Sequence, residues 1–352
     1  MKLVGIGDLF IPGSYIESGV KPLRDLGLSV KIIDWETNGF QGLQNINLIV
    51  EQNGAEAYEV PDYIINAVCD ADIIMTQFCP INRKVIDSCH NLKVVGVFRG
   101  GYENVNIEYC TEKGIAVMNT PGRNADSVAD FTVGALICEA RNIARGHYGL
   151  KNGEWIRNYP NSGVIPDLPG KTVGLVGLGE IGKKVAHRLS GFDMNIIAYD
   201  PYCKTVPEGV TLVELKELMS KSDFVSLHAR LTESNHHLIN SDMLALMKPT
   251  AYLINTSRAG LVDEAALYDA LSRKKIAGAM LDVFESEPPG KNHPLVNLPN
   301  ITLTPHMAGG SNDAFFLSPV KLTKELMRAW KNEIPAYVIN KECWRKDIWN
   351  LD

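Results

Sequence analysis

Apolar and polar residues alternate along the first third of the chain in a pattern that predicts strands separated by helices. Short apolar runs, of the length of buried strands, are separated by segments whose apolar residues recur every three or four positions. The predicted strands are residues 2–6, 29–34, 72–76, 92–98 and 115–118, and the predicted helices are residues 15–26, 61–69, 82–89 and 107–113. Strands that alternate with helices predict a parallel sheet with crossover helices.

The same alternation continues through the rest of the chain. The predicted strands are residues 172–176, 195–199, 224–227, 251–255, 277–283 and 301–304, and the predicted helices are residues 180–190, 212–221, 242–247, 264–273 and 311–331. A longer segment, residues 126–150, has apolar residues at helical spacing on more than one face. A helix of that kind is expected to be buried, either between domains or against another subunit.

A glycine-rich turn follows the predicted strand 172–176. Gly177, Gly179 and Gly182 have the spacing G-x-G-x-x-G and lead into the predicted helix 180–190. Such a turn suits a dinucleotide: the first glycine allows a tight turn, the second lets the backbone approach the pyrophosphate, and the third lets helix and strand pack closely. The N–H groups at the helix N-terminus then face the phosphates.

An acidic residue ends the strand that follows this helix. Asp200 lies where a carboxylate would accept hydrogen bonds from the adenosine ribose hydroxyls. It would repel a 2′-phosphate, and the neighbouring Pro201 and Tyr202 supply no cation. The expected cofactor is therefore NAD rather than NADP.

Composition and charge narrow the class of protein. The 352 residues suffice for two domains, and 45% hydrophobic with 22% charged residues is typical of a soluble globular protein. The net charge of −6 and the lack of a Lys/Arg cluster argue against a nucleic-acid partner. No apolar run is long enough to span a membrane, and the N-terminus resembles a first strand rather than a signal peptide.

The cysteines point to a reducing compartment. There are seven, an odd number, and no two of them form a C-x-x-C motif. This pattern suggests neither a disulfide framework nor a zinc site. We therefore expect reduced thiols, a cytoplasmic location and no bound metal.

Two residues at the ends of predicted strands have side chains suited to binding an acid and exchanging a proton. Arg258 follows the strand 251–255, and its planar guanidinium can bind a carboxylate. His306 follows the strand 301–304 and could accept a proton near neutral pH. The alternatives are a surface arginine and a structural histidine. Glu287 or Glu285 could orient the histidine and stabilise its protonated form, and the residues alone do not choose between these two glutamates.

Six motifs resemble those of one enzyme family, in the family's order. The chain is similar to the D-2-hydroxyacid dehydrogenases, which include phosphoglycerate, glycerate and D-lactate dehydrogenases. The matching stretches are VGVFRGGYENVNIEYC (95–110), NTPGRNADSVADFTVGALI (119–137), GLVGLGEIG (174–182), LINTSRAGLVDEAAL (253–267), GAMLDVFESEPP (278–289) and NITLTPHMAG (300–309). Residues 1–90 resemble the family only in general pattern.

The resemblance implies a fold and a domain division. It implies an α/β protein of two doubly wound parallel-sheet domains, one Rossmann-like and one flavodoxin-like, with a cleft between them. The NAD-binding Rossmann domain would comprise residues 119–310. The substrate domain would be discontinuous, residues 1–118 plus 311–352.

The resemblance also implies roles for individual residues. Arg258, Glu287 and His306 match the family's catalytic groups, and the E-P sequence favours Glu287 over Glu285. Arg99, Gly100 and Gly101 match the loop that, with Arg258, holds the substrate. Asp282 matches a residue that contacts the nicotinamide carboxamide, with a loop cap as the alternative. The full set of implied cofactor-binding residues is Gly177, Gly179, Glu180, Ile181, Gly182, Asp200, His228, Ala229, Arg230, Thr256, Asp282 and His306.

The expected function is that of an NAD-dependent D-2-hydroxyacid dehydrogenase. It would transfer a hydride between NAD(H) and a D-2-hydroxy acid/2-keto acid pair, with a mild preference of the motifs for a sugar-derived or phosphorylated acid. The alternative is an NAD-sensing corepressor-like binding protein of the same fold. We expect a homodimer, because of the apolar segment 126–150. Arg230, where the family often has proline, and the tail 341–352 have no assigned role.

Overall fold

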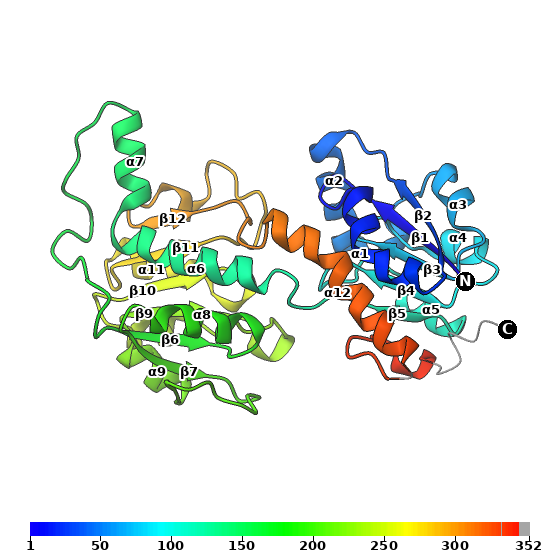
Figure 1. Cartoon of the computed structure of the whole chain (residues 1–352). Helices are drawn as coiled ribbons and strands as arrows, with labels where there is room; N and C mark the ends of the chain where they lie inside the picture. Colours follow the sequence, from blue (N-terminus) through cyan, green and yellow to red (C-terminus); the bar gives the residue numbers. More distant parts are fainter. Residues whose placement is uncertain (332, 345–352) are drawn as a thin grey trace. The chain divides into compact units, whose positions relative to one another are not determined.

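The computed structural model describes residues 1–331 and 333–344, and the chain divides into two compact units (Figure 1). The first unit comprises Met1–Arg123 and the segment that begins at Ser311, and the second unit is Asn124–Gly310. The first crossing between units therefore follows Arg123, where the sequence suggested Met118. Of the tail 341–352, residues 345–352 lie outside the described residues.

The first unit is built on a five-stranded parallel sheet. Its strand order is β2-β1-β3-β4-β5, the flavodoxin-like order. The strands are β1 (Lys2–Gly7), β2 (Ser29–Asp34), β3 (Ile73–Thr76), β4 (Val94–Val97) and β5 (Ala116–Met118). The middle strands are buried on both faces, as expected where helices cover both sides of a parallel sheet.

Helices form a layer on each face of this sheet. One face packs against α1 (Gly13–Asp25) and α12 (Asn312–Trp330), through residues such as Ile16 and Leu322. Gly19 lets these two helices approach, since a Cβ there would meet Pro319. The helices of the other face are α2 (Gly39–Asn53), α3 (Asp62–Val68), α4 (Arg83–Ser88) and α5 (Ile107–Glu112), with the short 3₁₀ turn η1 (Ala55–Ala57).

The second unit is built on a seven-stranded parallel sheet. Its order, β12-β11-β10-β9-β6-β7-β8, is a doubly wound Rossmann-like order that reverses between β6 and β9. The strands are β6 (Thr172–Val176), β7 (Asn195–Tyr199), β8 (Val210–Leu212), β9 (Phe224–Leu227), β10 (Tyr252–Asn255), β11 (Gly278–Leu281) and β12 (Ile301–Leu303). The two doubly wound parallel-sheet units confirm the expected fold class.

Helices also cover both faces of the second sheet. The face with α6 (Ala125–Ala140) and α8 (Glu180–Ser190) has its own apolar core. The opposite core includes α9 (Leu215–Lys221), α10 (Ser241–Leu246) and α11 (Glu264–Ser272). The remaining elements are α7 (Ile143–Lys151) and the 3₁₀ turns η2 (Glu233–Asn235), η3 (Ala259–Leu261), η4 (Pro294–Asn297) and, in the first unit, η5 (Lys341–Cys343).

The long helix expected at residues 126–150 is interrupted. It is two helices, α6 and α7, because Asn142 adopts a left-handed backbone conformation with φ of 57°. Asparagine tolerates that conformation, and its side chain also donates a hydrogen bond of 2.7 Å to Asn161. The apolar faces of α6 are buried inside the second unit itself, against α8, β10 and β11, so they need no domain or subunit interface.

Helix α2 was not predicted from the sequence. Only Leu43 and Val50 of its residues are buried, whereas Phe40, Leu48 and Ile49 are exposed. Its apolar residues therefore form no clear stripe toward the core, and the periodicity that identifies an amphipathic helix is weak.

Candidate active site

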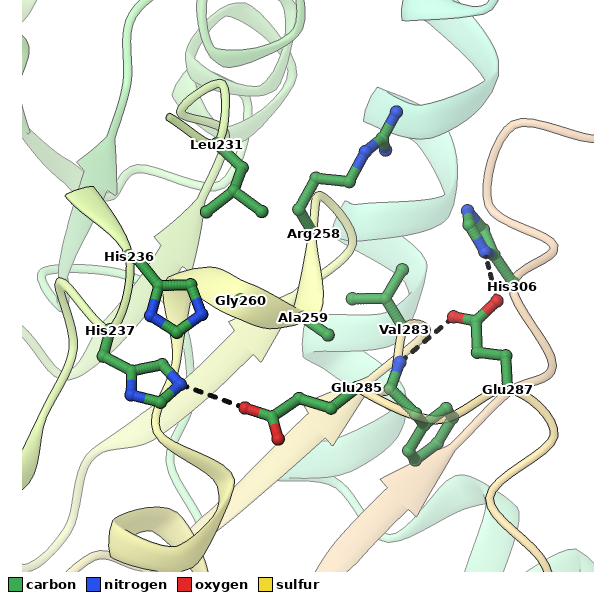
Figure 2. A pocket seen from close by; sticks show the side chains of 11 residues that line it. Leu231, His236, His237, Arg258, Ala259, Gly260, Val283, Glu285, Glu287 and His306 are labelled. Carbon is green, nitrogen blue, oxygen red and sulfur yellow. Dashed lines mark hydrogen bonds and ion pairs between the residues drawn. The ribbon is translucent and has the colours of Figure 1, made fainter. Parts of the chain in front are cut away.

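The expected catalytic residues lie at the carboxyl ends of three adjacent strands. Arg258 follows β10, Glu287 follows β11 and His306 follows β12, and these strands are hydrogen-bonded neighbours. In open α/β sheets ligands bind outside the carboxyl ends of the strands. The three side chains line one cavity of about 480 Å³ (Figure 2), so residues separated in sequence meet at one site.

His306 and Glu287 form a hydrogen-bonded pair. The Nδ1 atom of His306 is 2.8 Å from Oε2 of Glu287. The other carboxylate oxygen of Glu287 accepts a hydrogen bond of 3.1 Å from the backbone N–H of Phe284, and Figure 2 shows the glutamate bound on both sides. The glutamate is thus fixed, and the pairing of Nδ1 leaves Nε2 of His306 as the nitrogen for proton exchange with a substrate.

Glu285 pairs with a different histidine. Its carboxylate lies 3.0 Å from Nε2 of His237, on the opposite side of the cavity from His306 in Figure 2. The geometry therefore joins the catalytic candidate His306 to Glu287. His236 and His237 stack with ring centroids 3.9 Å apart and line the same cavity. Neither was predicted as a site residue, and their only signal in the sequence is that two of the eight histidines are adjacent.

Asp282 holds the segment that carries His306. Its buried carboxylate accepts hydrogen bonds from the Thr304 hydroxyl at 2.5 Å, the Met307 N–H at 2.9 Å and the Ala308 N–H at 2.8 Å. The backbone N–H of His306 donates to the Asp282 carbonyl at 2.9 Å. His306 has a positive φ of 48°, and such strain persists where surrounding contacts impose it. The contact of Asp282 with a nicotinamide carboxamide stays a prediction.

The loop that carries Arg258 is folded by a buried asparagine. The Asn255 side chain accepts from the Ser257 N–H at 3.0 Å and donates to the Arg258 carbonyl at 3.0 Å. These bonds turn the chain back at the end of β10 and leave the Arg258 side chain exposed, with a hydrogen bond of 2.8 Å to the Ser257 carbonyl. Arg258 thus keeps most of its donors for a ligand.

The glycine turn is as compact as the motif requires. Gly177 has a φ of 98°, and a Cβ there would come within 2.5 Å of the Ala229 backbone nitrogen. A Cβ on Gly182 would meet the carbonyl oxygen of Gly177. Around Gly179 the space is open, and no side chain of the described residues caps α8. The N-terminus of α8 is therefore free to bind a pyrophosphate.

Asp200 is tied to the same turn. One carboxylate oxygen accepts from the Leu178 N–H at 2.7 Å and the other from the Tyr202 N–H at 2.8 Å. Each oxygen retains acceptor capacity for a ribose hydroxyl. The carboxylate is thus positioned at the turn by the protein itself.

The other expected cofactor residues surround this edge of the sheet. His228 follows β9, its Nε2 is 2.9 Å from the Ser226 hydroxyl, and burial lowers its pKa to about 4, so it is neutral at pH 7. Thr256 is buried and shares a hydrogen bond of 2.8 Å with Thr132. Ala229 and Arg230 follow His228, and Glu180 and Ile181 are in the first turn of α8.

Substitutions in the glycine turn should separate folding from cofactor binding. Gly179→Ala is expected to leave the Tm unchanged, because the space is open, but to raise the Kd for NADH about tenfold or more, because the new methyl occupies the pyrophosphate position. Gly182→Ala should instead lower the Tm. Calorimetry and NADH fluorescence titration check both, and an unchanged Kd in Gly179→Ala would contradict this location for the pyrophosphate.

In the first unit, Arg99 is already bound to other side chains. Its guanidinium donates to Asn47 at 2.9 Å, to Glu103 at 3.1 Å and to Glu51, and it lies over the ring of Phe78. Because Asn47 and Glu51 are on α2, Arg99 fastens that helix to the end of β4. Its charge is balanced inside the protein. The backbone of Gly100 and Gly101, which follow it, stays the predicted partner of a substrate carboxylate.

A buried carboxylate in the same unit should make stability depend on pH. Burial raises the pKa of Asp8 from 3.8 to about 6, against hydrogen bonds from the Ile11 and Phe10 N–H groups and the charge of Arg123. Because the pKa is higher in the folded state, this carboxyl contributes stability at pH values below its unfolded-state pKa. That contribution is lost as the pH rises through its folded-state pKa. Between pH 4 and 7 the wild type should lose about 3 kcal/mol relative to Asp8→Asn. Urea unfolding of both proteins across this range checks it, and parallel curves would contradict it.

Comparison with known proteins identifies the family of this chain. The family model for the NAD-binding domain of D-isomer specific 2-hydroxyacid dehydrogenases matches residues 133–308. Glyoxylate reductase of Thermofilum pendens is 42% identical over 267 residues, which cover 74% of this chain and 79% of the relative. The chain belongs to the D-isomer specific 2-hydroxyacid dehydrogenase family.

Two further proteins extend this similarity. D-3-phosphoglycerate dehydrogenase of Methanocaldococcus jannaschii is 40% identical over 282 residues, or 79% of this chain, but the match spans only 53% of that longer protein. The crystal structure of the TT0316 protein from Thermus thermophilus superimposes with a TM-score of 0.72, at 30% identity, covering 96% of this chain and 100% of the other.

Membership in the D-isomer specific 2-hydroxyacid dehydrogenase family makes this protein an NAD-dependent oxidoreductase that acts on the CH–OH group of a 2-hydroxy acid. These relatives are reductases and dehydrogenases and give no support to the corepressor-like alternative. Across residues 1–331 and 333–344, no helix combines the length and apolar character of a membrane span.

Proposed function

We propose that the protein interconverts a D-2-hydroxy acid and its 2-oxo acid with Arg258, Glu287 and His306 as the catalytic residues. The observation that supports this most is the His306–Glu287 pair, 2.8 Å apart, in the cavity that Arg258 also lines. When NAD is bound, it would accept the hydride from C2 of the hydroxy acid, and NADH would return it to C2 of the 2-oxo acid. Gly179, the N-terminus of α8 and Asp200 would hold the cofactor.

The protein's own groups account for the binding and the proton. The Arg258 guanidinium binds the substrate carboxylate and the 2-oxygen, which fixes C2 and stabilises charge on the oxygen during reduction. His306 removes the hydroxyl proton in oxidation and returns it in reduction. Glu287 holds the imidazole and balances its positive charge. The loop at Arg99, Gly100 and Gly101 would bind the carboxylate from the first unit through backbone N–H groups.

A substrate panel tests this function. NADH consumption is followed with glyoxylate, pyruvate, hydroxypyruvate, 3-phosphohydroxypyruvate and longer sugar-derived 2-oxo acids, and each is repeated with NADPH. We expect turnover of at least one of these acids with NADH and much weaker turnover with NADPH, because Asp200 repels a 2′-phosphate. Tight NADH binding without turnover of any acid would contradict the proposed activity.

We also propose that the protein is a homodimer, joined through α7 and the segment that follows it. This arm carries exposed apolar side chains: Ile143 is 54% exposed, Tyr148 72%, Leu150 60% and Trp155 80%. Figure 1 shows α7 standing away from the sheet of the second unit. Exposed apolar surface of this extent is typical of a protein interface.

Charge on the arm should break the dimer. Leu150→Asp and Trp155→Asp are each expected to give a monomer in light scattering after size exclusion, because an unpaired carboxylate would be buried at the interface. Tyr268→Asp, at an exposed position of α11, is the control and should remain dimeric. A monomeric wild type would remove the proposal. A cytoplasmic location is proposed as well, supported by the seven free thiols.

A further inference from the structure

Three polar side chains at the carboxyl edge of the first unit's sheet have buried atoms without a hydrogen-bond partner among the described residues. Asp8 follows β1, Gln77 follows β3 and Arg123 lies beyond β5. The orphaned atoms are Oδ2 of Asp8, both amide atoms of Gln77 and one terminal nitrogen, Nη1, of Arg123. Asp8 is only 4% exposed and Gln77 only 1%.

Such a concentration is costly for a fold. Each buried polar group without a partner costs about 1–3 kcal/mol, and most buried polar groups in proteins are bonded. Here four such atoms occur on three side chains at one edge. That edge is also where open parallel sheets bind ligands. A ligand with several polar groups would satisfy them.

The three side chains belong to one neighbourhood. The charge of Arg123 and the backbone N–H of Phe78, next to Gln77, both lower the pKa of Asp8 against the larger effect of burial. The Arg123 guanidinium lies 5.1 Å from the ring centroid of Phe315, which is 5.2 Å from that of Phe10. Phe10 in turn is 6.0 Å from Phe78. These contacts link the segments that follow β1 and β3 to the start of α12 and to Arg123.

The charges of this neighbourhood do not suit a phosphate. Asp8 offsets the charge of Arg123, and Arg99 is already paired with Glu51 and Glu103. A phosphate would therefore find neither arginine with an unbalanced positive charge, and it would be repelled by the Asp8 carboxylate. Hydroxyl groups fit better, because each hydroxyl both donates and accepts a hydrogen bond. Asp8 supplies a carboxylate acceptor, Gln77 an amide that can donate and accept, and Arg123 a guanidinium donor.

We propose that Asp8, Gln77 and Arg123 form a subsite for hydroxyl groups at C3 and beyond of the substrate, so that the substrate is a hydroxylated, unphosphorylated 2-oxo acid. The inference rests on the proposed function, which brings the substrate carboxylate to the loop at Gly100, at the end of the strand next to β3. Of the two substrate classes that the sequence motifs left open, the proposed subsite favours the sugar-derived acids over the phosphorylated acids.

Three 2-oxo acids of the same carbon skeleton test the subsite. With NADH, the wild type is expected to reduce hydroxypyruvate with a kcat/KM at least about 100-fold above that for pyruvate, because a site built for a hydroxyl rejects the analogue without it. It should also prefer hydroxypyruvate to 3-phosphohydroxypyruvate. A preference for pyruvate or for the phosphorylated acid overturns the subsite and leaves the proposed reduction of 2-oxo acids intact.

Two near-isosteric variants test the residues. Gln77→Leu should lower the ratio of hydroxypyruvate to pyruvate kcat/KM at least about tenfold, since one buried hydrogen bond is worth roughly that factor. Asp8→Asn should raise the relative kcat/KM for 3-phosphohydroxypyruvate by removing the repelling charge. Gln41→Leu, the same change on the exposed side of α2, is the control and should keep the wild-type ratios.

Measurements of Tm, with and without ligand, test the subsite independently of turnover. Gln77→Leu should raise the Tm, because it removes orphaned polar atoms from an apolar setting; a lower Tm with unchanged ratios would assign Gln77 a purely structural role and overturn the proposal. With NAD present, D-glycerate should raise the wild-type Tm more than D-lactate does. If no 2-oxo acid is reduced, the proposed function fails, and equal Tm shifts by the two acids would then remove the subsite as well.

Discussion

His306→Ala is expected to lower turnover of the 2-oxo acid by at least ~100-fold, the usual contribution of a positioned general acid–base group. Among the described residues, His306 is the only imidazole hydrogen-bonded to Glu287, at 2.8 Å. Alanine removes this imidazole and with it the proton donor for the 2-oxygen. Hydride transfer without that proton would leave an alkoxide. The measurement is steady-state kcat with NADH.

A matched variant, His237→Ala, separates the loss of the proton donor from the general effect of removing a histidine from the cavity. His237 pairs with Glu285 at 3.0 Å, is less exposed than His306 (36% against 50%) and lines the same cavity. His237→Ala should therefore cost far less turnover than His306→Ala. Both variants should still bind NADH, since neither changes the glycine turn. Near-normal turnover of His306→Ala, or an equal loss in His237→Ala, would refute the assignment of His306 as the proton donor.

The fold could be predicted because its main signals are local. Apolar runs and the glycine spacing at Gly177–Gly182 are properties of short stretches, and parallel strands joined by helices then permit few topologies. Two features that were missed have signals that are not local. Helix α2 has only two buried apolar residues and is fastened by Arg99, which follows a strand far along the chain. The interruption at Asn142 depends on Asn161.

In the candidate site, too, some residues could be predicted from local sequence and others could not. Arg258 and His306 could be found because each follows a predicted strand, and strand ends meet at one edge of a parallel sheet. The choice between Glu285 and Glu287 could not be made from chemistry alone, because both are carboxylates in one loop and only the distances separate them. The ion pairs of Arg99 could not be foreseen either, since its partners Glu51 and Glu103 balance a charge that the sequence presents as free for the substrate.

Arg258→Gln is expected to lower kcat/KM for the 2-oxo acid about 10²- to 10³-fold, the effect of removing a donor that stabilises charge on a reacting oxygen. Arg258 is exposed, and its one side-chain hydrogen bond among the described residues is to the carbonyl of its neighbour Ser257, so its remaining donors can bind the substrate. Arg258→Lys keeps the charge but loses the planar fork, and should therefore recover only part of the loss. NADH affinity and Tm should stay unchanged in both, because the side chain supports no other element.

Chemical rescue distinguishes a substrate-binding arginine from one that merely shapes the cavity. Guanidinium chloride at sub-denaturing concentration should restore part of the kcat/KM of Arg258→Ala, because the free ion can occupy the vacated position and bind the carboxylate and the 2-oxygen as the side chain did. It should not restore His306→Ala, which lacks a proton donor. Arg273→Ala, at the exposed end of α11, should behave as the wild type. Full activity in Arg258→Gln would show that the carboxylate is held elsewhere, and the backbone loop at Gly100 and Gly101 would then be the remaining anchor.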